Sequence, residues 1–209
     1  MAATINRAMK ILGAGALAIA IAGCSSILAP QPDRTKFYVL TPVPESATPA
    51  QNGAPNGRVI GLGPVKLPAY LDRPEIVTRA APNRIELSKI DRWAEPLHGN
   101  FVQVLSRDLS ARLGAGRIVR FPWYSTTPID LQVRLEVYRF ETGAQGTAHL
   151  TAGWTLVNGA GTTVLYNGQS DISENAKAGD ATEAAAALSR AVNVLSGQIA
   201  AQAARQPAK

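Results

Sequence analysis

Hydrophobic and polar residues alternate in two runs along the second half of the chain. From Ile129 to Val137, apolar side chains occupy every second position and mostly charged or amide side chains lie between them. From Ala148 to Leu156, alanine, leucine and tryptophan alternate in the same way with polar residues or glycine. A period of two is typical of a strand with one buried face. The turn sequence of residues 158–161 leads into a third strand at about 162–170, which predicts an antiparallel meander.

A different periodicity predicts two helices. Between residues 96 and 113 apolar side chains recur at every fourth position, and Gly114 follows as the end of the helix. A second helix is expected from about Ala181, because Asp180 and Glu183 are spaced as a capping pair. The apolar face of this second helix consists of Leu188, Val192, Leu195 and Ile199.

The first half of the chain predicts short strands, at residues 37–40, 59–65, 76–79 and 84–87, with one more at 118–121. Ala81-Pro82-Asn83 connects the third and fourth of these strands in a hairpin, and this turn is a candidate contact surface. Strands, a helix, strands and a second helix follow one another in this order. The order predicts a single α/β domain, a three-layer α/β/α sandwich with a mixed sheet.

Gly61 and Gly63 interrupt the second of the short strands. Glycines inside a strand indicate a bulge or a close approach by another group. A dinucleotide-binding turn is the alternative, but the third glycine of that motif is missing and prolines break the segment that follows. We therefore expect a structural role for this pair.

The N-terminus has the pattern of a bacterial lipoprotein signal. Arg7 and Lys10 precede an apolar stretch that is short for a membrane span, and Ile21-Ala22-Gly23-Cys24 ends it with the only cysteine of the chain. This tetrapeptide resembles the lipobox, in which the cysteine thiol receives a lipid and becomes the new N-terminus. We expect a signal peptide at 1–23, a lipidated tether at 24–35 and a folded domain at 36–205. A transmembrane anchor or an ordinary buried cysteine is the alternative.

Residue 25 bears on which membrane would hold the lipid. It is Ser25 and not Asp. By resemblance to enterobacterial sorting, this favours the periplasmic face of the outer membrane. Several acyl chains on one cysteine would hold the domain stably without a spanning helix.

Composition argues against nucleic acid as a partner. The chain has a net charge of +6, which falls to +4 once Arg7 and Lys10 leave with the signal peptide. The remaining basic residues are scattered along the sequence and are not interleaved with aromatic residues, as a nucleic-acid surface would require. Without a second cysteine the fold cannot use a disulfide, so buried apolar area has to stabilise it.

The sequence offers no clear catalytic constellation. His98 and His149 are the only histidines, and neither has the spacing of a metal site. A triad of His98 and Asp91 with Ser88 or Ser106, or a carboxylate pair among Glu86, Asp91 and Glu95, is not supported by any recognisable motif. We expect no enzyme, no metal, and no cofactor other than the lipid on Cys24.

Four segments carry a family resemblance: Phe37-Tyr38-Val39-Leu40-Thr41-Pro42, the run from Gly63 to Val77 with its Leu-Pro-Ala-Tyr-Leu-Asp-Arg-Pro core, Asn83-Arg84-Ile85-Glu86-Leu87, and Arg92-Trp93-Ala94-Glu95-Pro96-Leu97. They resemble the PqiC/YmbA-type lipoproteins, the ABC-type transport auxiliary lipoprotein component. The resemblance covers nearly the whole mature chain. It implies an α/β/α sandwich that acts as a non-enzymatic part of an MCE-type lipid transport system.

The partners implied by this resemblance are a periplasmic MCE-domain protein and its inner-membrane ABC permease and ATPase, and a homo-oligomeric ring is plausible. We expect residues 67–79 to form a partner-facing loop with Trp93, and the candidate contacts are Tyr70, Leu71, Asp72, Arg73 and Trp93. A packed crossover with Tyr70 and Trp93 in the core is the alternative. Alternative functions are a lipoprotein that carries the lipid itself and a murein-associated lipoprotein.

Overall fold

The computed structural model describes residues 32–42, 44, 57–113 and 117–206. The predicted signal peptide, Cys24 and most of the predicted tether lie outside these residues. The chain from Thr35 onward forms one compact unit. Its elements are β1 (Lys36–Tyr38), β2 (Val59–Lys66), η2 (Ala69–Leu71), β3 (Glu75–Ala81), β4 (Arg84–Trp93), α2 (Leu97–Leu113), β5 (Arg117–Arg120), β6 (Leu131–Gly143), β7 (Thr147–Asn158), β8 (Val164–Asn175) and α3 (Ala181–Arg205).

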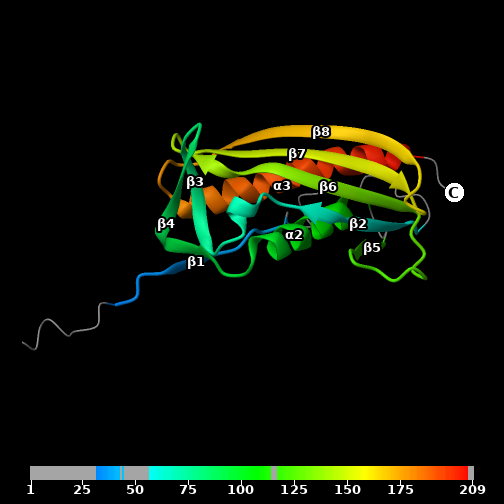
Figure 1. Cartoon of the computed structure of the whole chain (residues 1–209), viewed down its shortest axis with the longest axis horizontal. Helices are drawn as coiled ribbons and strands as arrows, with labels where there is room; N and C mark the ends of the chain where they lie inside the picture. Colours follow the sequence, from blue (N-terminus) through cyan, green and yellow to red (C-terminus); the bar gives the residue numbers. More distant parts are fainter. Residues whose placement is uncertain (1–31, 43, 45–56, 114–116, 207–209) are drawn as a thin grey trace, which may run out of the picture. The chain divides into compact units, whose positions relative to one another are not determined.

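One eight-stranded mixed sheet organises these elements (Figure 1). The long strand β6 lies at its centre: its first half pairs in parallel with β2, its end pairs in parallel with β3, and β7 follows it antiparallel along the other edge. Strands β6, β7 and β8 form the predicted antiparallel meander. The remaining strands extend the sheet outward, β5 from β2, and β4 then β1 from β3. The predicted mixed α/β domain is therefore confirmed.

Several strands are longer than predicted; β4, for example, runs from Arg84 to Trp93, where a strand at residues 84–87 was expected. β6 continues to Gly143 because a register shift between Val137 and Arg139 lets the strand go on after its alternation is interrupted. β8 continues to Asn175 although most of its side chains are exposed and its last residues are mainly polar. Its hydrogen-bonded pairing with β7 along the whole strand, and not its own sequence pattern, holds it in the sheet.

Both predicted helices are confirmed, and α3 starts at the predicted cap. The Asp180 carboxylate accepts hydrogen bonds from the backbone N–H groups of Thr182 (3.0 Å) and Glu183 (3.2 Å). Such a cap satisfies two donors that the first turn would otherwise leave unpaired. Among the described residues, neither helix combines the length and the apolar character that crossing a membrane requires.

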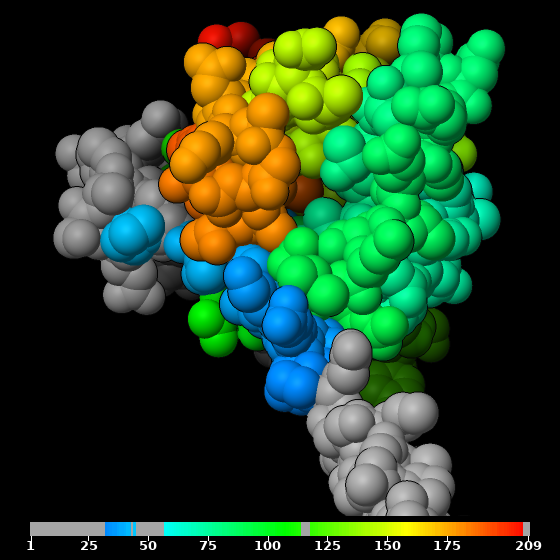
Figure 2. All heavy atoms as spheres, turned by 90° about the vertical axis from the view of Figure 1, so that its left-hand side faces the viewer, coloured from blue at the N-terminus to red at the C-terminus, as the bar shows by residue number. Residues whose placement is uncertain are grey.

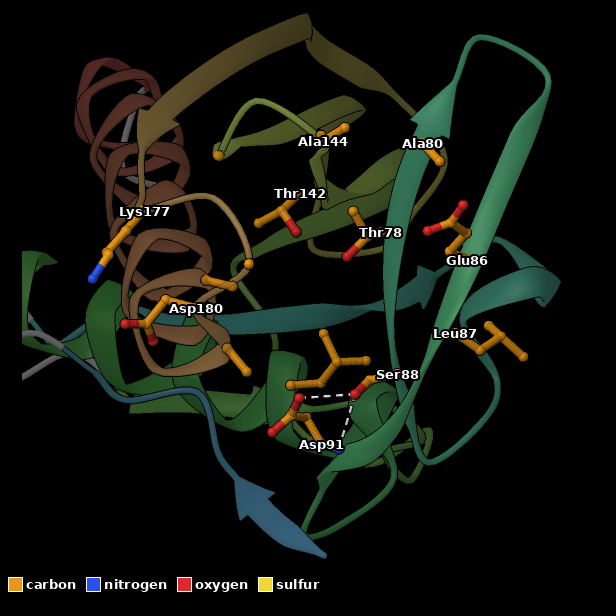
Figure 3. Close-up of a pocket in the computed structure, with 16 residues that line it drawn as sticks. Thr78, Ala80, Glu86, Leu87, Ser88, Asp91, Thr142, Ala144, Lys177 and Asp180 are labelled. Atoms are coloured by element: carbon orange, nitrogen blue, oxygen red, sulfur yellow. Dashed lines mark hydrogen bonds between the residues drawn. The ribbon is translucent and has the colours of Figure 1, made fainter.

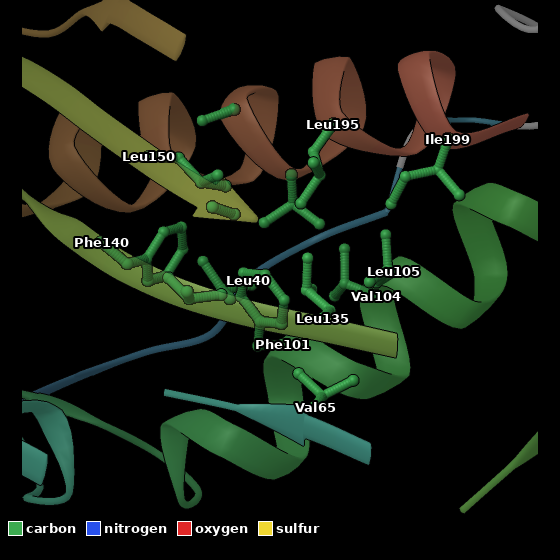
Figure 4. Close-up of a cluster of buried hydrophobic side chains, with 14 of the residues drawn as sticks. Leu40, Val65, Phe101, Val104, Leu105, Leu135, Phe140, Leu150, Leu195 and Ile199 are labelled. Carbon is green, nitrogen blue, oxygen red and sulfur yellow. The ribbon is translucent and has the colours of Figure 1, made fainter. Parts of the chain in front are cut away.

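The helices and the sheet share one hydrophobic core (Figure 4). Phe101 of α2 meets Phe140 of β6 edge to face, with ring centroids 5.1 Å apart. Leu195 and Ile199 of α3 face the same cluster and are fully buried. Burying one such leucine side chain contributes about 1.5–3 kcal/mol, so this cluster supplies the stability that a fold without disulfides needs.

The predicted three-layer arrangement is not shown by the described residues. α2 and α3 contact each other, and both contact the sheet on the side of the shared core. The side chains that alternate with the core positions of β6, Arg134, Glu136 and Tyr138, are exposed. A second helical layer over these side chains is absent from the described part of the chain.

Candidate partner-binding site

The segment that joins β2 to β3 carries most of the predicted contact residues. It contains the single turn η2, in which the backbone N–H groups of Leu71 and Asp72 donate to the carbonyls of Pro68 (3.0 Å) and Ala69 (3.1 Å). At the end of the segment, the backbone N–H of Trp93 donates to the carbonyl of Pro74 (2.7 Å). Local hydrogen bonds and two prolines therefore give this connection a defined backbone.

The structure divides the five predicted contact residues into two groups. Leu71 and Trp93 are buried, with 3% and 5% of their surface exposed, and Tyr70 is partly buried against the core. Asp72 is exposed and Arg73 is half-buried. Trp93 thus follows the packed alternative, and the surface available to a partner comes from Asp72 and Arg73.

A buried carboxylate fixes Tyr70. The Tyr70 hydroxyl donates to Glu141 Oε2 (2.5 Å), while Arg79 Nε (2.6 Å) and Arg139 Nε (2.8 Å) both donate to Glu141 Oε1. The side chain of Glu141 is completely buried, and the Arg79 guanidinium also lies 5.8 Å from the centre of the Tyr70 ring. The cluster ties the segment to β3 and to the end of β6.

The hydrogen bonds of this cluster explain two pKa shifts. Burial of the Tyr70 phenol, together with its hydrogen bond to Glu141, raises the pKa of Tyr70 to about 12. For Glu141, burial acts to raise the pKa, but hydrogen bonds from Tyr70, Arg79 and Arg139 outweigh it, and the pKa is lowered. The carboxylate is therefore charged and the phenol neutral at physiological pH.

Sequence patterns gave no indication of Glu141, because its strand was predicted to end at Val137. The signal that could have located it is the pair Arg139 and Glu141 beyond the interrupted alternation, since a charged pair inside a longer strand suggests a buried ionic cluster.

Asp72 and Arg73 line a shallow hollow of about 310 Å³, which we call the crossover hollow; its other lining residues are Pro74, Trp93, Ala94, Glu95 and Pro96. The Nε of Arg73 is buried and has no hydrogen-bond partner among the described residues. Buried donors are normally paired, so this donor is an exception among the described residues.

A second hollow of about 360 Å³, the hairpin hollow, lies between the β3–β4 hairpin, the end of β6 and the start of α3 (Figures 2 and 3). Thr78 and Glu86 line it from the hairpin, and Lys177 and Asp180 from the other side. At its base the Asp91 carboxylate accepts from the hydroxyls of Ser88 (2.8 Å) and Tyr38 (3.1 Å). The predicted contact turn, residues 81–83, stands at the tip of this hairpin.

Neither hollow has the groups of an acyl-transfer or metal site. His98 bonds through Nε2 to the carbonyl of Val65 (2.9 Å), and His149 bonds through Nδ1 to Ser173 (3.1 Å), so neither meets Asp91, whose carboxylate is held by Ser88 and Tyr38. No group of three potential metal ligands occurs in residues 32–42, 44, 57–113 and 117–206. The described residues therefore do not bring His98 and Asp91 together as the candidate triad would require.

Comparison with known proteins identifies the class. The family model of the ABC-type transport auxiliary lipoprotein component matches residues 38–200. The chain therefore belongs to this family, whose members are described as components of transport systems and as lipoproteins, which implies attachment to a membrane through a lipid.

Two solved structures with TM-scores of 0.66 agree with the fold. A crystallised protein from Xanthomonas campestris has 17% sequence identity and a TM-score of 0.66, and the alignment covers 81% of this chain and 95% of that protein. A second crystallised, uncharacterized protein has 16% identity and a TM-score of 0.66, with 81% and 98% covered. A PelC dodecamer from Paraburkholderia phytofirmans has 13% identity and a TM-score of 0.38, with 71% and 95% covered. No curated protein matches the chain.

Proposed function

We propose that this chain is the auxiliary lipoprotein of an MCE-type ABC lipid transport system, anchored through a lipid on Cys24 to the periplasmic face of the outer membrane. The observation that carries the proposal is the family match over residues 38–200. It is supported independently by Ile21-Ala22-Gly23-Cys24, which ends the apolar N-terminal stretch. The partners are a periplasmic MCE-domain protein and, through it, the inner-membrane permease and ATPase.

Asp72 and Arg73 form the partner contact in this proposal. Both lie beside the crossover hollow, and their segment is held by Glu141 and by the Trp93–Pro74 backbone hydrogen bond. A preorganised contact loses less conformational freedom on binding. The lipid would confine the domain to the membrane surface, so a modest affinity per contact is sufficient.

The core favours an adaptor over the alternative of a lipid carrier. Phe101, Leu105 and Leu195, which lie between helices and sheet, are fully buried. The crossover and hairpin hollows open on the surface and are lined partly by charged residues, whereas a lipid carrier needs an enclosed apolar cavity. A murein-associated role is disfavoured because Trp93, its expected sugar platform, is 5% exposed.

The test is affinity purification of the lipidated protein from membrane extract, with mass spectrometry of the proteins and lipids that accompany it. An MCE-domain protein without stoichiometric lipid supports the adaptor. Phospholipid bound in a fixed ratio to the purified chain supports a carrier instead. If neither an MCE-domain protein nor bound phospholipid is recovered, the proposal is contradicted.

The contact itself is tested by replacing Asp72 and Arg73 with alanine. The matched control replaces Glu174 and Arg190, an ion pair of the same charges that lines neither hollow and has 3.1 Å between its charged atoms. We expect the first variant to lose the MCE protein and the control to retain it. Equal recovery with both variants would show that the contact lies elsewhere.

A further inference from the structure

The loop that follows β5 exposes three aromatic side chains close together in sequence. Phe121 is 54% exposed and Tyr124 is 84% exposed, while Trp123 is half-buried between them. Phe121 and Trp123 touch edge to face, with ring centroids 5.4 Å apart. We call residues 121–124 the aromatic loop. Exposed large apolar residues that cluster in this way usually mark an interaction surface.

Two glycines hold the aromatic loop against the open face of the sheet. A Cβ on Gly61 would lie 2.8 Å from the Trp123 ring, and a Cβ on Gly63 would lie 2.6 Å from Phe121 Cβ. Gly63 also has a φ of +124°, which a residue with a side chain rarely adopts. The close approach predicted for this glycine pair is therefore confirmed, and its role is to seat the aromatic residues on β2.

Backbone hydrogen bonds fix the loop at both ends. The N–H of Phe121 donates to the carbonyl of Leu62 (2.9 Å), and the N–H of Thr127 donates to the carbonyl of Tyr124 (2.9 Å). The aromatic residues are consequently presented by a defined surface, which lowers the entropy that binding would cost.

An exposed arginine adjoins the loop in the sequence. No carboxylate occurs in the sequence between Arg120 and Asp130. Arg120, which immediately precedes Phe121, is exposed. Asp130, the first acidic residue after the loop, accepts a hydrogen bond from the backbone N–H of Val59 (2.8 Å). Aromatic side chains next to an exposed arginine complement the headgroup region of an anionic lipid bilayer.

The chain also limits how far the domain can lie from a membrane. Cys24 and Lys36, the first residue of β1, are twelve positions apart in the sequence. An extended segment of that length spans at most about 40 Å. If Cys24 carries a lipid, β1 always lies within that distance of the bilayer, and a weak surface contact elsewhere on the domain would be populated often.

We infer that the aromatic loop docks on the surface of the anionic lipid bilayer to which the chain is anchored. Phe121 and Tyr124 enter the headgroup region, Trp123 lies at its edge, and Arg120 pairs with lipid phosphate. The inference rests on the lipid anchor of the proposed function. It would fix the orientation of the domain, and with it the direction in which Asp72 and Arg73 face.

Tryptophan fluorescence tests this contact, because Trp93 and Trp154 are each 5% exposed and Trp123 alone among the three tryptophans is half-buried. The lipidated protein is reconstituted in vesicles of phosphatidylethanolamine and phosphatidylglycerol whose acyl chains are brominated. We expect quenching of the emission, loss of that quenching in Trp123→Phe, and its loss in the double variant Phe121→Ser/Tyr124→Ser. Tyr138→Ser, which removes another exposed aromatic side chain, is the control and should leave quenching unchanged.

Each other outcome overturns the inference. If the native chain and Trp123→Phe both bind the vesicles and their emission is quenched equally, the aromatic loop does not contact lipid. If Phe121→Ser/Tyr124→Ser loses the MCE protein while the native chain shows no quenching, the loop is a protein contact. A protein that does not sediment with the vesicles has no lipid anchor, and this result rejects the proposed function itself.

Discussion

Glu141 is the side chain on which the connection between β2 and β3 depends most. Its carboxylate accepts hydrogen bonds from Tyr70, Arg79 and Arg139, and it is completely buried. A buried charge without partners is costly, so the three donors and the carboxylate stabilise the fold only as a complete set. The cluster therefore links the stability of the domain to the position of Asp72 and Arg73.

Replacing Glu141 with glutamine should destabilise the domain by about 3 kcal/mol, since the buried group that pairs Tyr70 with two partly exposed arginines loses its charge. Urea unfolding measures the change. Glu136→Gln is the matched control, because Glu136 lies on the exposed side of the same strand. The control should change stability by less than about 0.5 kcal/mol. Similar losses of unfolding free energy in both variants would mean that the buried carboxylate contributes no more to stability than an exposed one.

Tyr70 should give the domain a distinct dependence on alkaline pH. Its pKa is raised to about 12 in the folded chain from an ordinary value of 10.0, so folding favours the neutral phenol. The stabilisation is complete below pH 10 and is lost as the pH rises from 10 to about 12. Tyr70→Phe removes it. The difference in unfolding free energy between native protein and variant should shrink across that range, and a constant difference would contradict the assignment.

The stabilisation by Glu141 depends on pH in the opposite direction and is lost at acidic pH. The pKa of Glu141 is lowered by its hydrogen bonds in spite of its burial, so its stabilisation is present above pH 4.5 and is lost as the pH falls through the lowered value. Glu141→Gln should therefore remove part of the acid sensitivity of the native protein. Unfolding followed between neutral and acidic pH measures this effect.

At the scale of elements, the packing of β7 against β8 depends on a missing side chain. A Cβ on Gly168 would lie 2.3 Å from the Trp154 ring, which is 5% exposed and donates from Nε1 to the Ser170 hydroxyl (3.0 Å). Gly168→Ala should destabilise the domain by about 1–3 kcal/mol, as overpacking does. Each kcal/mol corresponds to about 2–4 °C in the thermal midpoint.

Gly99→Ala is the matched control for this prediction. Gly99 lies in the first turn of α2, and a Cβ there would meet nothing within 4 Å. Alanine should stabilise the helix by up to about 1 kcal/mol. Opposite shifts of the thermal midpoint are thus expected from the same chemical change, and shifts of the same sign would contradict the packing around Trp154.

Sequence periodicity located the elements whose patterns are strong and missed what depends on contacts between distant residues. The meander, both helices and the Asp180 cap follow from local patterns. The parallel pairing of β6 with β2 and β3, and the continuation of β6 to Glu141, depend on neighbours far apart in the chain. Local patterns do not encode such pairing, which is why a third layer was expected and Glu141 was missed.

The candidate site was predicted only in part for the same reason. The sequence marked residues 70–73 and Trp93, but an apolar or aromatic residue has no local signal that separates a contact from a core position. Burial of Leu71 and Trp93, and the hydrogen bond of Tyr70 to Glu141, follow from the packing of β4 and β6 around the segment.

At the scale of the whole molecule, the proposed lipid on Cys24 and the proposed contact at Asp72 and Arg73 should act together. Cys24→Ala removes the proposed lipid attachment site and should release the protein from the membrane fraction. Because the anchored domain reaches its partner at high effective concentration, release should also weaken partner capture in cells while leaving the fold unchanged. Membrane fractionation and circular dichroism of the two forms measure both effects. A variant that still fractionates with membranes would contradict the anchor.

Site-specific photo-crosslinking in living cells tests the proposed function most directly. A photoreactive amino acid replaces Asp72 in one strain and Asp171, an exposed residue of β8 that lines neither hollow, in another, and the crosslinked products are identified by mass spectrometry. We predict that position 72 crosslinks to an MCE-domain protein and that position 171 does not. Crosslinks from position 72 to unrelated envelope proteins, or to none in a chain that is expressed and anchored, would contradict the assignment of this domain as the adaptor of an MCE transport system.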